Sequence, residues 1–401
     1  MPGDELSIIN YMTDAVLLAA CRTAIGTARR GTLRDTSAFD LATVVVREAV
    51  RRSGVPLDLI DDVVLGETLA GGGDIARYAA LEAGLTHVPG LAHNRHCASG
   101  LSSVATAAAG VRAGMDRVVV AGGTQSSSTA PQARRRIPGT DDWQDPWMSP
   151  SHVPTREAPN DDMATLVGWN TARLTGISRQ EMDSWALRSH QRAVRAIDGG
   201  RFADEIVPVE VIDRDGTKSV FDTDEHPRRD TSIEKLAALK VLHPEIDGYS
   251  ITAGNSSGVN DGSAAVVVAS SEVAAEHGLA LLATVRSWAS VGVDPAETGL
   301  APIAAIRKAL DRAGLRIEDV DLFEVNEAFA AVAVATTREL DLDPERVNPF
   351  GSGCSLGHPI ATTGARMIVT LAHELRRRGG GTAVAAMCAG GGMGSAMVLT
   401  V

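Results

Sequence analysis

The sequence predicts an α/β protein made of two similar halves with a segment inserted between them. Helical and strand periodicities alternate near both ends of the 401-residue chain, a pattern typical of α/β folds. A motif near the N-terminus recurs near the C-terminus, and the composition changes between the two copies. We therefore expect an N-terminal half at 1–125 that is completed by about 256–280, an inserted loop domain at 126–255, and a C-terminal half at 281–401.

The repeated motif spans residues 47–67 and 307–327, which align without a gap so that Gly54 falls on Gly314. Each copy has the pattern of an amphipathic helix, a glycine stop and an apolar strand. The alternative is a chance similarity between two helix–strand units. The unbroken register favours duplication.

A second correspondence follows in each half. A small-residue stretch at 97–110 leads to an apolar strand at 117–121 that ends at Gly122-Gly123. A helical stretch at 363–378 leads to a strand at 382–387, with a run of three glycines at 390–392. This order predicts a largely parallel sheet in each half, and the small residues predict helices packed tightly at the centre.

The inserted segment is richer in Pro, Arg and Asp than its surroundings. We expect 134–150 to be an irregular excursion. A strongly periodic helix is predicted at about 179–197, beginning at Ser178 and Glu181 with the signature of a capping box.

Composition narrows the function. The formal net charge of −12 disfavours a nucleic-acid partner. No apolar run approaches the roughly 20 residues that span a bilayer, and Met1–Asn10 lacks the basic region of a signal peptide. Four widely spaced cysteines without a CxxC pair indicate reduced thiols rather than a disulfide framework or a zinc site. We expect a cytoplasmic protein with no metal.

One candidate reactive residue is Cys97, in the sequence NRHCASG. It lies between a predicted strand and a predicted helix start. Unpaired N–H groups and the helix dipole at such a position lower a thiol's pKa and stabilise an oxyanion. A buried, inert cysteine is the alternative.

Three further loops carry candidate groups. His358 lies between Gly357 and Pro359, where a fixed ring suits a general base or an oxyanion donor; a histidine bound only by loop carbonyls is the alternative. Cys388 precedes the glycine run, which is not a dinucleotide loop because too few residues follow it to form the required helix. Asn326 stands where the first repeat has Gly66, and a turn-capping role is its alternative.

The motifs together resemble the thiolase family. NRHCASG, AGNSSGVNDG, VNEAFA, LGHP and CAGGGMG occur in the family's order and approximate spacing, and RSHQRAVRAIDGGRFADEIVPV resembles its loop-domain helix. The similarity runs from Ala15 to the C-terminus. It implies a duplicated thiolase fold, with two βαβ-type halves packed in layers and a loop domain covering a coenzyme A site.

The resemblance also implies roles. Cys97 would be the nucleophile that carries the acyl group, and His358 would activate it and donate to the thioester oxygen. Asn326 would fix a water in that oxyanion hole, while the backbone N–H groups of Cys97 and Gly390 would form a second hole. Cys388 would be the acid/base for the α-proton.

Coenzyme A would be a substrate, with no other cofactor. Ser257 and Arg228 match positions that touch it, and Ala328 and Phe329 would line the pantetheine tunnel. The run at 134–136 of three arginines could offset phosphate charge, or it could be a solvated surface run. The family relationship further implies CoA thioester substrates, a homodimer or homotetramer, and a multienzyme partner in β-oxidation.

Some positions depart from the family pattern. Counted back from Gly176, the family's Met-Gly pair at the acyl end falls on Ala164-Thr165, although Met163 is one position away, and a usual Glu becomes Trp169. Loss of a methionine side chain would predict acceptance of longer or branched acyl groups. Ala-Thr-Thr-Gly at 361–364 replaces the commoner Gly-Ala-Ser-Gly, and Cys354 is interpreted as a packing residue.

The predicted function is reversible thiolytic cleavage of 3-ketoacyl-CoA to acetyl-CoA and a shortened acyl-CoA, as in fatty-acid metabolism. A biosynthetic acetyl-CoA acetyltransferase would use the same site. A decarboxylating ketosynthase needs no second catalytic thiol, so Cys388 counts against it. A non-enzymatic scaffold would leave the four catalytic positions unexplained.

Overall fold

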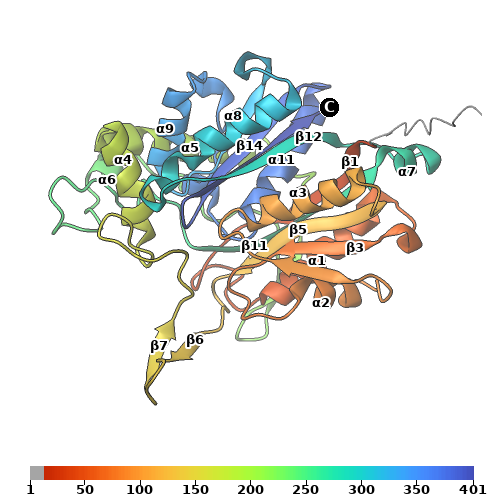
Figure 1. The fold of residues 1–401 in the computed structure, drawn as a ribbon, viewed down its shortest axis with the longest axis horizontal. Helices are drawn as coiled ribbons and strands as arrows, with labels where there is room; N and C mark the ends of the chain where they lie inside the picture. Colours follow the sequence, from red (N-terminus) through yellow and green to blue (C-terminus); the bar gives the residue numbers. More distant parts are fainter. Residues whose placement is uncertain (1–12) are drawn as a thin grey trace, which may run out of the picture.

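The computed structural model describes residues 13–401, so the Met1–Asn10 segment lies outside the described residues. Helices and strands form five layers (Figure 1), in the order helices, sheet, helices, sheet, helices. Separate apolar clusters fill the outer helix–sheet interfaces, and another joins the two sheets through the central helices. No helix among residues 13–401 is long and apolar enough to cross a membrane.

The elements of the N-terminal half are β1 (Ala15–Thr23), β2 (Gly26–Thr27), α1 (Ala38–Ser53), β3 (Asp62–Gly66), α2 (Ile75–Glu82), β4 (Gly90–His93), α3 (Ser99–Arg112), β5 (Val118–Ser126) and β11 (Asn260–Ser270). Helix α7 (Ser271–Glu276) follows β11 and packs in the core of the N-terminal half. The C-terminal elements are β12 (Ala283–Gly292), α8 (Ala301–Ala313), β13 (Leu322–Val325), α9 (Ala330–Glu339), α10 (Gly353–Leu356), α11 (Thr363–Arg378), β14 (Thr382–Ala389) and β15 (Met393–Thr400).

The strand order confirms the duplication. The first sheet runs β4-β3-β5-β11-β1, and the second runs β12-β15-β14-β13, so equivalent strands occupy equivalent places. The two sheets meet where β1 pairs with β12, at Val16–Thr284 and Leu17–Ala283.

Each sheet is mixed, so the prediction of largely parallel sheets is wrong. Only β3 with β4 and β5, and β13 with β14, are parallel neighbours within the halves. These pairs are joined through helical crossovers, which produce parallel neighbours. The other strands enter antiparallel: β15 returns from β14 through a tight turn, and β11 returns after the whole insertion.

The repeated motif has the same local structure in both halves. Helices α1 and α8 end at Gly54 and Gly314, both in the left-handed conformation with φ of 67°. The carboxylate of Asp61 accepts hydrogen bonds from the backbone N–H groups that begin β5, and Asp321 accepts one from Thr382 at the start of β14. Each aspartate therefore fixes the start of the neighbouring strand.

The central helices α3 and α11 pack backbone against backbone. A Cβ atom at Gly100 would lie 2.6 Å from the carbonyl oxygen of Ala361, and one at Gly364 would overlap Leu101. Gly123 faces the same Ala361 carbonyl, so β5 continues through its glycines to Ser126 instead of ending there as predicted. Glycine is needed at these positions because two backbone segments approach closely, not because the chain turns.

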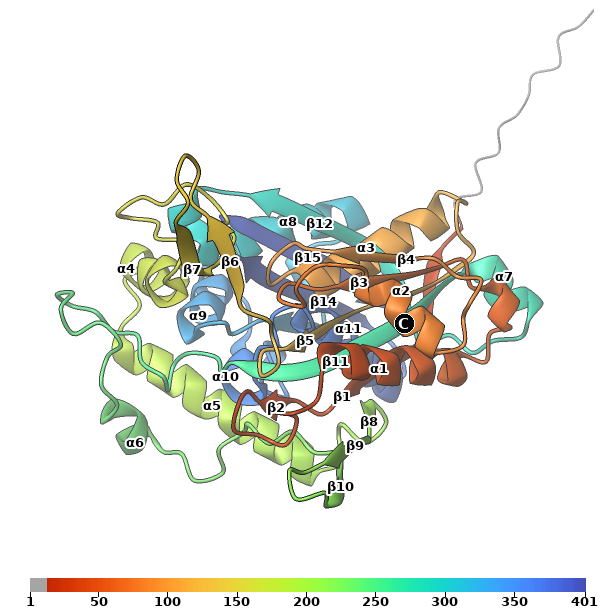
Figure 2. The ribbon, with the colours of Figure 1, turned by 90° about the horizontal axis from the view of Figure 1, so that it is seen from below.

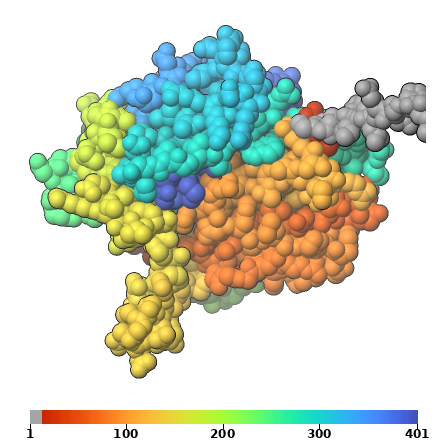
Figure 3. All heavy atoms as spheres, in the orientation of Figure 1, coloured from red at the N-terminus to blue at the C-terminus, as the bar shows by residue number. Residues whose placement is uncertain are grey.

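The inserted segment contains β6 (Ala133–Arg136), β7 (Trp143–Trp147), α4 (Asn170–Thr175), α5 (Arg179–Asp198), β8 (Ile206–Val207), β9 (Val209–Ile212), β10 (Lys218–Phe221) and α6 (Ile233–Ala237). Helix α5 begins with the predicted Ser178–Glu181 capping box. The stretch expected to be irregular is instead the β6–β7 hairpin, which projects from the body of the molecule (Figures 1 and 3).

The rest of the insertion lies along one side of the molecule (Figure 2). Arg22 joins this part of the insertion to β1. Its fully buried guanidinium donates hydrogen bonds to the carboxylate of Glu205 at 2.6 Å and to both carboxylate oxygens of Asp224 at 2.8 Å. Buried charges are tolerated when they are paired in this way, and removing one partner would leave an uncompensated charge.

The close α3–α11 packing gives a prediction. Replacing Gly100 with alanine should lower the free energy of unfolding by about 1–3 kcal/mol, because the added methyl group meets backbone that cannot rotate away. Urea titration would measure the change. Gly292→Ala is the control, since the nearest atom to its added methyl group is 4.0 Å away. Equal stability of the two variants would contradict this account.

Candidate active site

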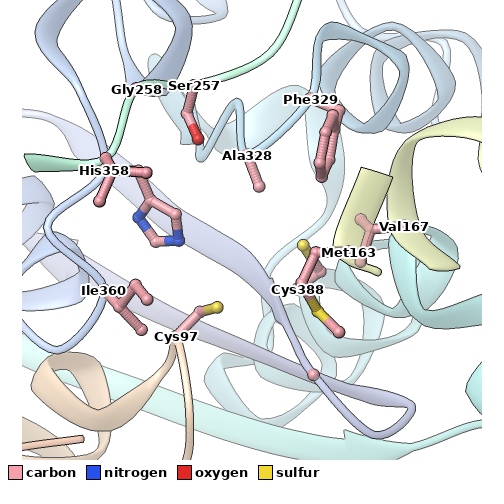
Figure 4. Close-up of a pocket in the computed structure, with 12 residues that line it drawn as sticks. Cys97, Met163, Val167, Ser257, Gly258, Ala328, Phe329, His358, Ile360 and Cys388 are labelled. Atoms are coloured by element: carbon pink, nitrogen blue, oxygen red, sulfur yellow. The ribbon is translucent and has the colours of Figure 1, made fainter. Parts of the chain in front are cut away.

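A cavity of about 220 Å³ opens where both halves and the insertion meet. Figure 4 shows the side chains of Cys97, His358 and Cys388 directed into it from three separate segments of the chain. Its lining residues are Cys97, Met163, Val167, Ser257, Gly258, Val259, Ala328, Phe329, His358, Ile360, Cys388 and Gly390. The folding of distant segments therefore places two thiols and one imidazole on a single, mostly apolar cavity.

Cys97 lies two residues before α3, just after His96, which adopts a left-handed φ of 46°. It is the one cysteine of the four with a partly exposed side chain. Burial raises the pKa of the Cys97 thiol, and hydrogen bonds from the backbone N–H groups of Gly390 and Cys97 itself lower it only in part. The expected lowered pKa is thus wrong, because desolvation outweighs the N–H groups.

His358 is held between the β11 strand and the start of α11. Its backbone N–H donates to Asn260 Oδ1 at 3.0 Å, and its Nδ1 lies 2.7 Å from the hydroxyl of Thr363. Its Nε2 is buried without a hydrogen-bond partner. Burial, aided by the positive charge of Arg366, lowers the His358 pKa to about 4, so the ring is neutral at pH 7.

Asn326 follows β13 and is fully buried, with its Nδ2 3.5 Å from Nδ1 of His358. Its Oδ1 has no hydrogen-bond partner. A buried polar atom without a partner is costly and calls for a ligand or a water. At the matching position Gly66, a Cβ atom would lie 2.6 Å from the backbone of Ser99, so the first half has no room for a side chain there.

Cys388 is the penultimate residue of β14, and Gly390 opens the turn to β15. Burial and the neighbouring Cys97 raise the pKa of the Cys388 thiol well above its usual range. Both sulfurs are therefore protonated at rest. A protonated thiol in an apolar cavity can donate a proton to a carbanion that forms beside it.

Glu327, next to Asn326, fixes the surrounding loops. Its buried carboxylate accepts hydrogen bonds from Trp185 and Ser189 of α5, from Asn348, and from the backbone N–H of Cys354. The carboxylate thus joins the insertion to the loops that carry Asn326 and His358. Cys354 packs against it, with its sulfur 3.6 Å from the Glu327 carbonyl oxygen.

A second cavity of about 430 Å³ adjoins the first through Ser257 and Gly258. Arg228 and Lys235 line this outer cavity, together with Asp230. Of the four residues assigned to coenzyme A, Ser257, Ala328 and Phe329 line the inner cavity and Arg228 lines the outer one. Ser257 donates its backbone N–H to the Ala328 carbonyl at 2.9 Å, which fixes the passage between the cavities.

The acyl end differs from the expectation based on Ala164. Met163 and Val167 line the cavity, and the sulfur of Met163 lies beside Gly390, whereas Ala164 packs into the core. Residues 164–169 form a π-helix, which holds one extra residue in a turn. Met163, one position before Ala164, therefore supplies a methionine side chain at this end of the cavity. Trp169 stacks on Tyr249 with ring centroids 5.3 Å apart.

Other residues fall outside these expectations. The arginines at 134–136 lie on the exposed hairpin, where Arg134 and Arg135 stack on tryptophans, and none of them is among the residues that line the two cavities. Sequence reasoning missed Ile360 in the inner cavity and His190 and His226 in the outer one. Of these three residues, only Ile360 could have been predicted to line a cavity, because it lies two residues after His358 in the sequence.

Two family models match the chain: the N-terminal domain of thiolase at residues 15–272 and its C-terminal domain at residues 279–401. An acetyl-CoA acetyltransferase of Pseudomonas aeruginosa is 42% identical over 400 residues, covering 97% of this chain and 99% of that protein. A 3-oxoadipyl-CoA/3-oxo-5,6-dehydrosuberyl-CoA thiolase of Escherichia coli is 41% identical over 402 residues, covering 97% and 99%.

Solved structures agree. The Bacillus anthracis acetyl-CoA acetyltransferase superposes with a TM-score of 0.88 at 40% identity, covering 98% of this chain and 99% of that one. Human mitochondrial 3-ketoacyl-CoA thiolase gives a TM-score of 0.86 at 35% identity, covering 97% and 98%. The chain therefore has the fold of acyl-transferring enzymes, and it belongs to the thiolase family.

The difference in exposure predicts which thiol reacts first. Iodoacetamide at neutral pH should modify Cys97 before the three buried cysteines, and the rate should rise with pH because the raised pKa keeps this thiol protonated. Peptide mass spectrometry would identify the modified residue, and acetyl-CoA should protect it. First modification of Cys21 or Cys354 would count against Cys97 as the reactive thiol.

Proposed function

We propose that this enzyme catalyses reversible thiolytic cleavage of 3-ketoacyl-CoA by coenzyme A through an acyl-Cys97 intermediate. The observation that supports it most is the meeting of Cys97, Cys388 and His358 on one apolar cavity. Two thiols suit a reaction that requires a nucleophile, a good leaving group and a separate proton donor.

In the first step, His358 Nε2 takes the proton of Cys97, and the sulfur attacks the 3-keto carbon. The N–H groups of Cys97 and Gly390, or the oxyanion site at His358 and Asn326, hold the oxygen as it gains negative charge. The unpaired Nε2 of His358 supports its role as the base that takes the Cys97 proton. The unpaired Oδ1 of Asn326 could accept a hydrogen bond from a water whose other proton is donated to the substrate oxygen.

In the second step, the bond between C2 and C3 breaks, and the leaving enolate takes a proton from Cys388, giving acetyl-CoA and acyl-Cys97. The incoming coenzyme A gives its thiol proton to the Cys388 thiolate and attacks the acyl group. Cys97 then leaves as a thiolate and regains its proton from His358. Because the Cys388 thiol is held protonated at rest, it is ready to act as the acid in cleavage.

Coenzyme A would run from the outer to the inner cavity. Its phosphates would lie near Arg228 and Lys235, and its pantetheine arm would pass Ser257 toward Ala328 and Phe329. A positive outer cavity on an acidic protein favours the anionic end of this substrate.

The second candidate is biosynthetic condensation of two acetyl-CoA molecules, which the names of several relatives favour. The same residues would act in reverse, with Cys388 as the base. A ketosynthase-type reaction has less support, because it gives Cys388 no task.

We also propose a homo-oligomer, since β4 is an edge strand that exposes Leu91.

The test of this function is Cys388→Ala. This variant should still accept an acetyl group from acetyl-CoA, because acylation of Cys97 uses His358 and the oxyanion donors. Condensation and thiolysis should fall by roughly 10²–10⁴-fold, as is typical when a general acid/base is removed. Mass spectrometry would detect the trapped acetyl-enzyme, and spectrophotometric assay of acetoacetyl-CoA would follow turnover.

Cys21→Ala is the matched control, since it removes a buried thiol that lies in the N-terminal core and lines neither cavity. Near-normal thiolysis by Cys388→Ala would overturn the proposed mechanism.

Acyl preference should depend on Met163 and not on Ala164. Met163→Ala enlarges the acyl end, so the ratio of kcat/KM for longer to shorter 3-ketoacyl-CoA substrates should rise by roughly 10-fold or more, the effect of one or more methylene groups in an apolar pocket. Ala164→Met is the control that should leave this ratio unchanged. The reverse pattern would return the specificity role to Ala164.

A further inference from the structure

Thr363, the first residue of α11, contacts Nδ1 of His358 and is not among the residues that line the catalytic cavity. We propose that Thr363 is a positioning residue that holds His358 in the tautomer with a proton on Nδ1 and a free lone pair on Nε2. The proposal rests on the function proposed above, in which Nε2 takes the proton of Cys97.

The argument begins with the single proton of the Thr363 hydroxyl. Its Oγ1 lies 2.9 Å from the carbonyl oxygen of Pro359, four residues earlier, which is the usual acceptor for a threonine in a helical turn. A carbonyl oxygen can only accept, so the hydroxyl proton is directed there. Toward His358 the same oxygen offers only lone pairs.

Nδ1 of His358 lies 2.7 Å from this oxygen, so Nδ1 must be the donor. The neutral imidazole carries one N–H, and its presence on Nδ1 leaves Nε2 unprotonated. The nearest competing group is Nδ2 of Asn326 at 3.5 Å from Nδ1, a distance at which a hydrogen bond is weak. Thr363 is therefore the partner that decides the tautomer.

The tautomer matters because burial keeps the ring neutral at pH 7. A neutral imidazole with its proton on Nε2 could not accept a proton from Cys97. Thr363 is fully buried and β-branched, so its rotamer is restricted and its oxygen stays in place. The same orienting principle operates in the Ser-His-Asp triad, where a carboxylate fixes the histidine tautomer.

The neighbouring Thr362 provides a matched control. It is also buried, and its hydroxyl donates to the Gly262 carbonyl at 2.7 Å without contacting His358. Thr363→Val and Thr362→Val each replace a buried hydroxyl with a methyl group of similar size. Thr363→Ser keeps the hydroxyl and loses only the methyl group.

The first measurement is the single-turnover rate of acetyl transfer from acetyl-CoA to Cys97, followed by rapid quench and mass spectrometry. We expect Thr363→Val to lower the maximal rate by about 10- to 100-fold, as when an orienting partner is lost. The acetyl-CoA concentration at half-maximal rate should stay unchanged. Thr363→Ser should retain most of the rate, and Thr362→Val should match the unmodified enzyme.

The second measurement, ¹⁵N NMR of histidine-labelled enzyme without substrate, reads the tautomer directly, with His358→Gln assigning the resonance. We expect the Nδ1–H tautomer in the unmodified enzyme and in Thr362→Val, and a shift toward Nε2–H in Thr363→Val. Failure of the unmodified enzyme to form acetyl-Cys97 would sink the proposed function while leaving the tautomer result intact. An unchanged tautomer in Thr363→Val, or an equal rate loss in Thr362→Val, would overturn the positioning role.

Discussion

The active site depends on the contact between helices α3 and α11 at the centre of the molecule. Cys97 lies just before one helix and His358 just before the other, so the distance between helix axes determines how the two residues face each other. Glycines at 100 and 364 permit backbone contact that any Cβ atom would prevent. The duplicated fold supplies this contact because each half contributes one equivalent helix.

The duplication also explains why the halves share a fold but divide the chemistry. Gly66 and Asn326 occupy equivalent strand ends, yet only the second has space for a side chain. In the first half, α3 packs directly on that position. The C-terminal half could therefore acquire a polar group at its strand end, while the N-terminal half contributes Cys97, the proposed nucleophile. Glu327 then ties this polar end to the insertion through α5.

Much of the fold and the site could be predicted from the sequence, since short motifs at fixed spacing identify the family and carry its residues with them. The capping box of α5 and the glycine stops at Gly54 and Gly314 are local signals, and these predictions were correct. Strand direction was predicted wrongly, because pairing depends on where distant segments return. The π-helix at 164–169 was missed for a similar reason, since an extra residue in a turn leaves no mark in the sequence.

The charge state of the site is likewise a property of the fold. A helix start suggested a lowered pKa for Cys97, but the apolar cavity adds a larger desolvation effect in the opposite direction. The same burial keeps His358 neutral, so the resting pair holds no charge. Charge would form only when a thioester or ketone fills the cavity and the N–H groups at Cys97 and Gly390 have an oxygen to stabilise. Because the resting pair is neutral, these N–H groups stabilise negative charge only in the reacting complex.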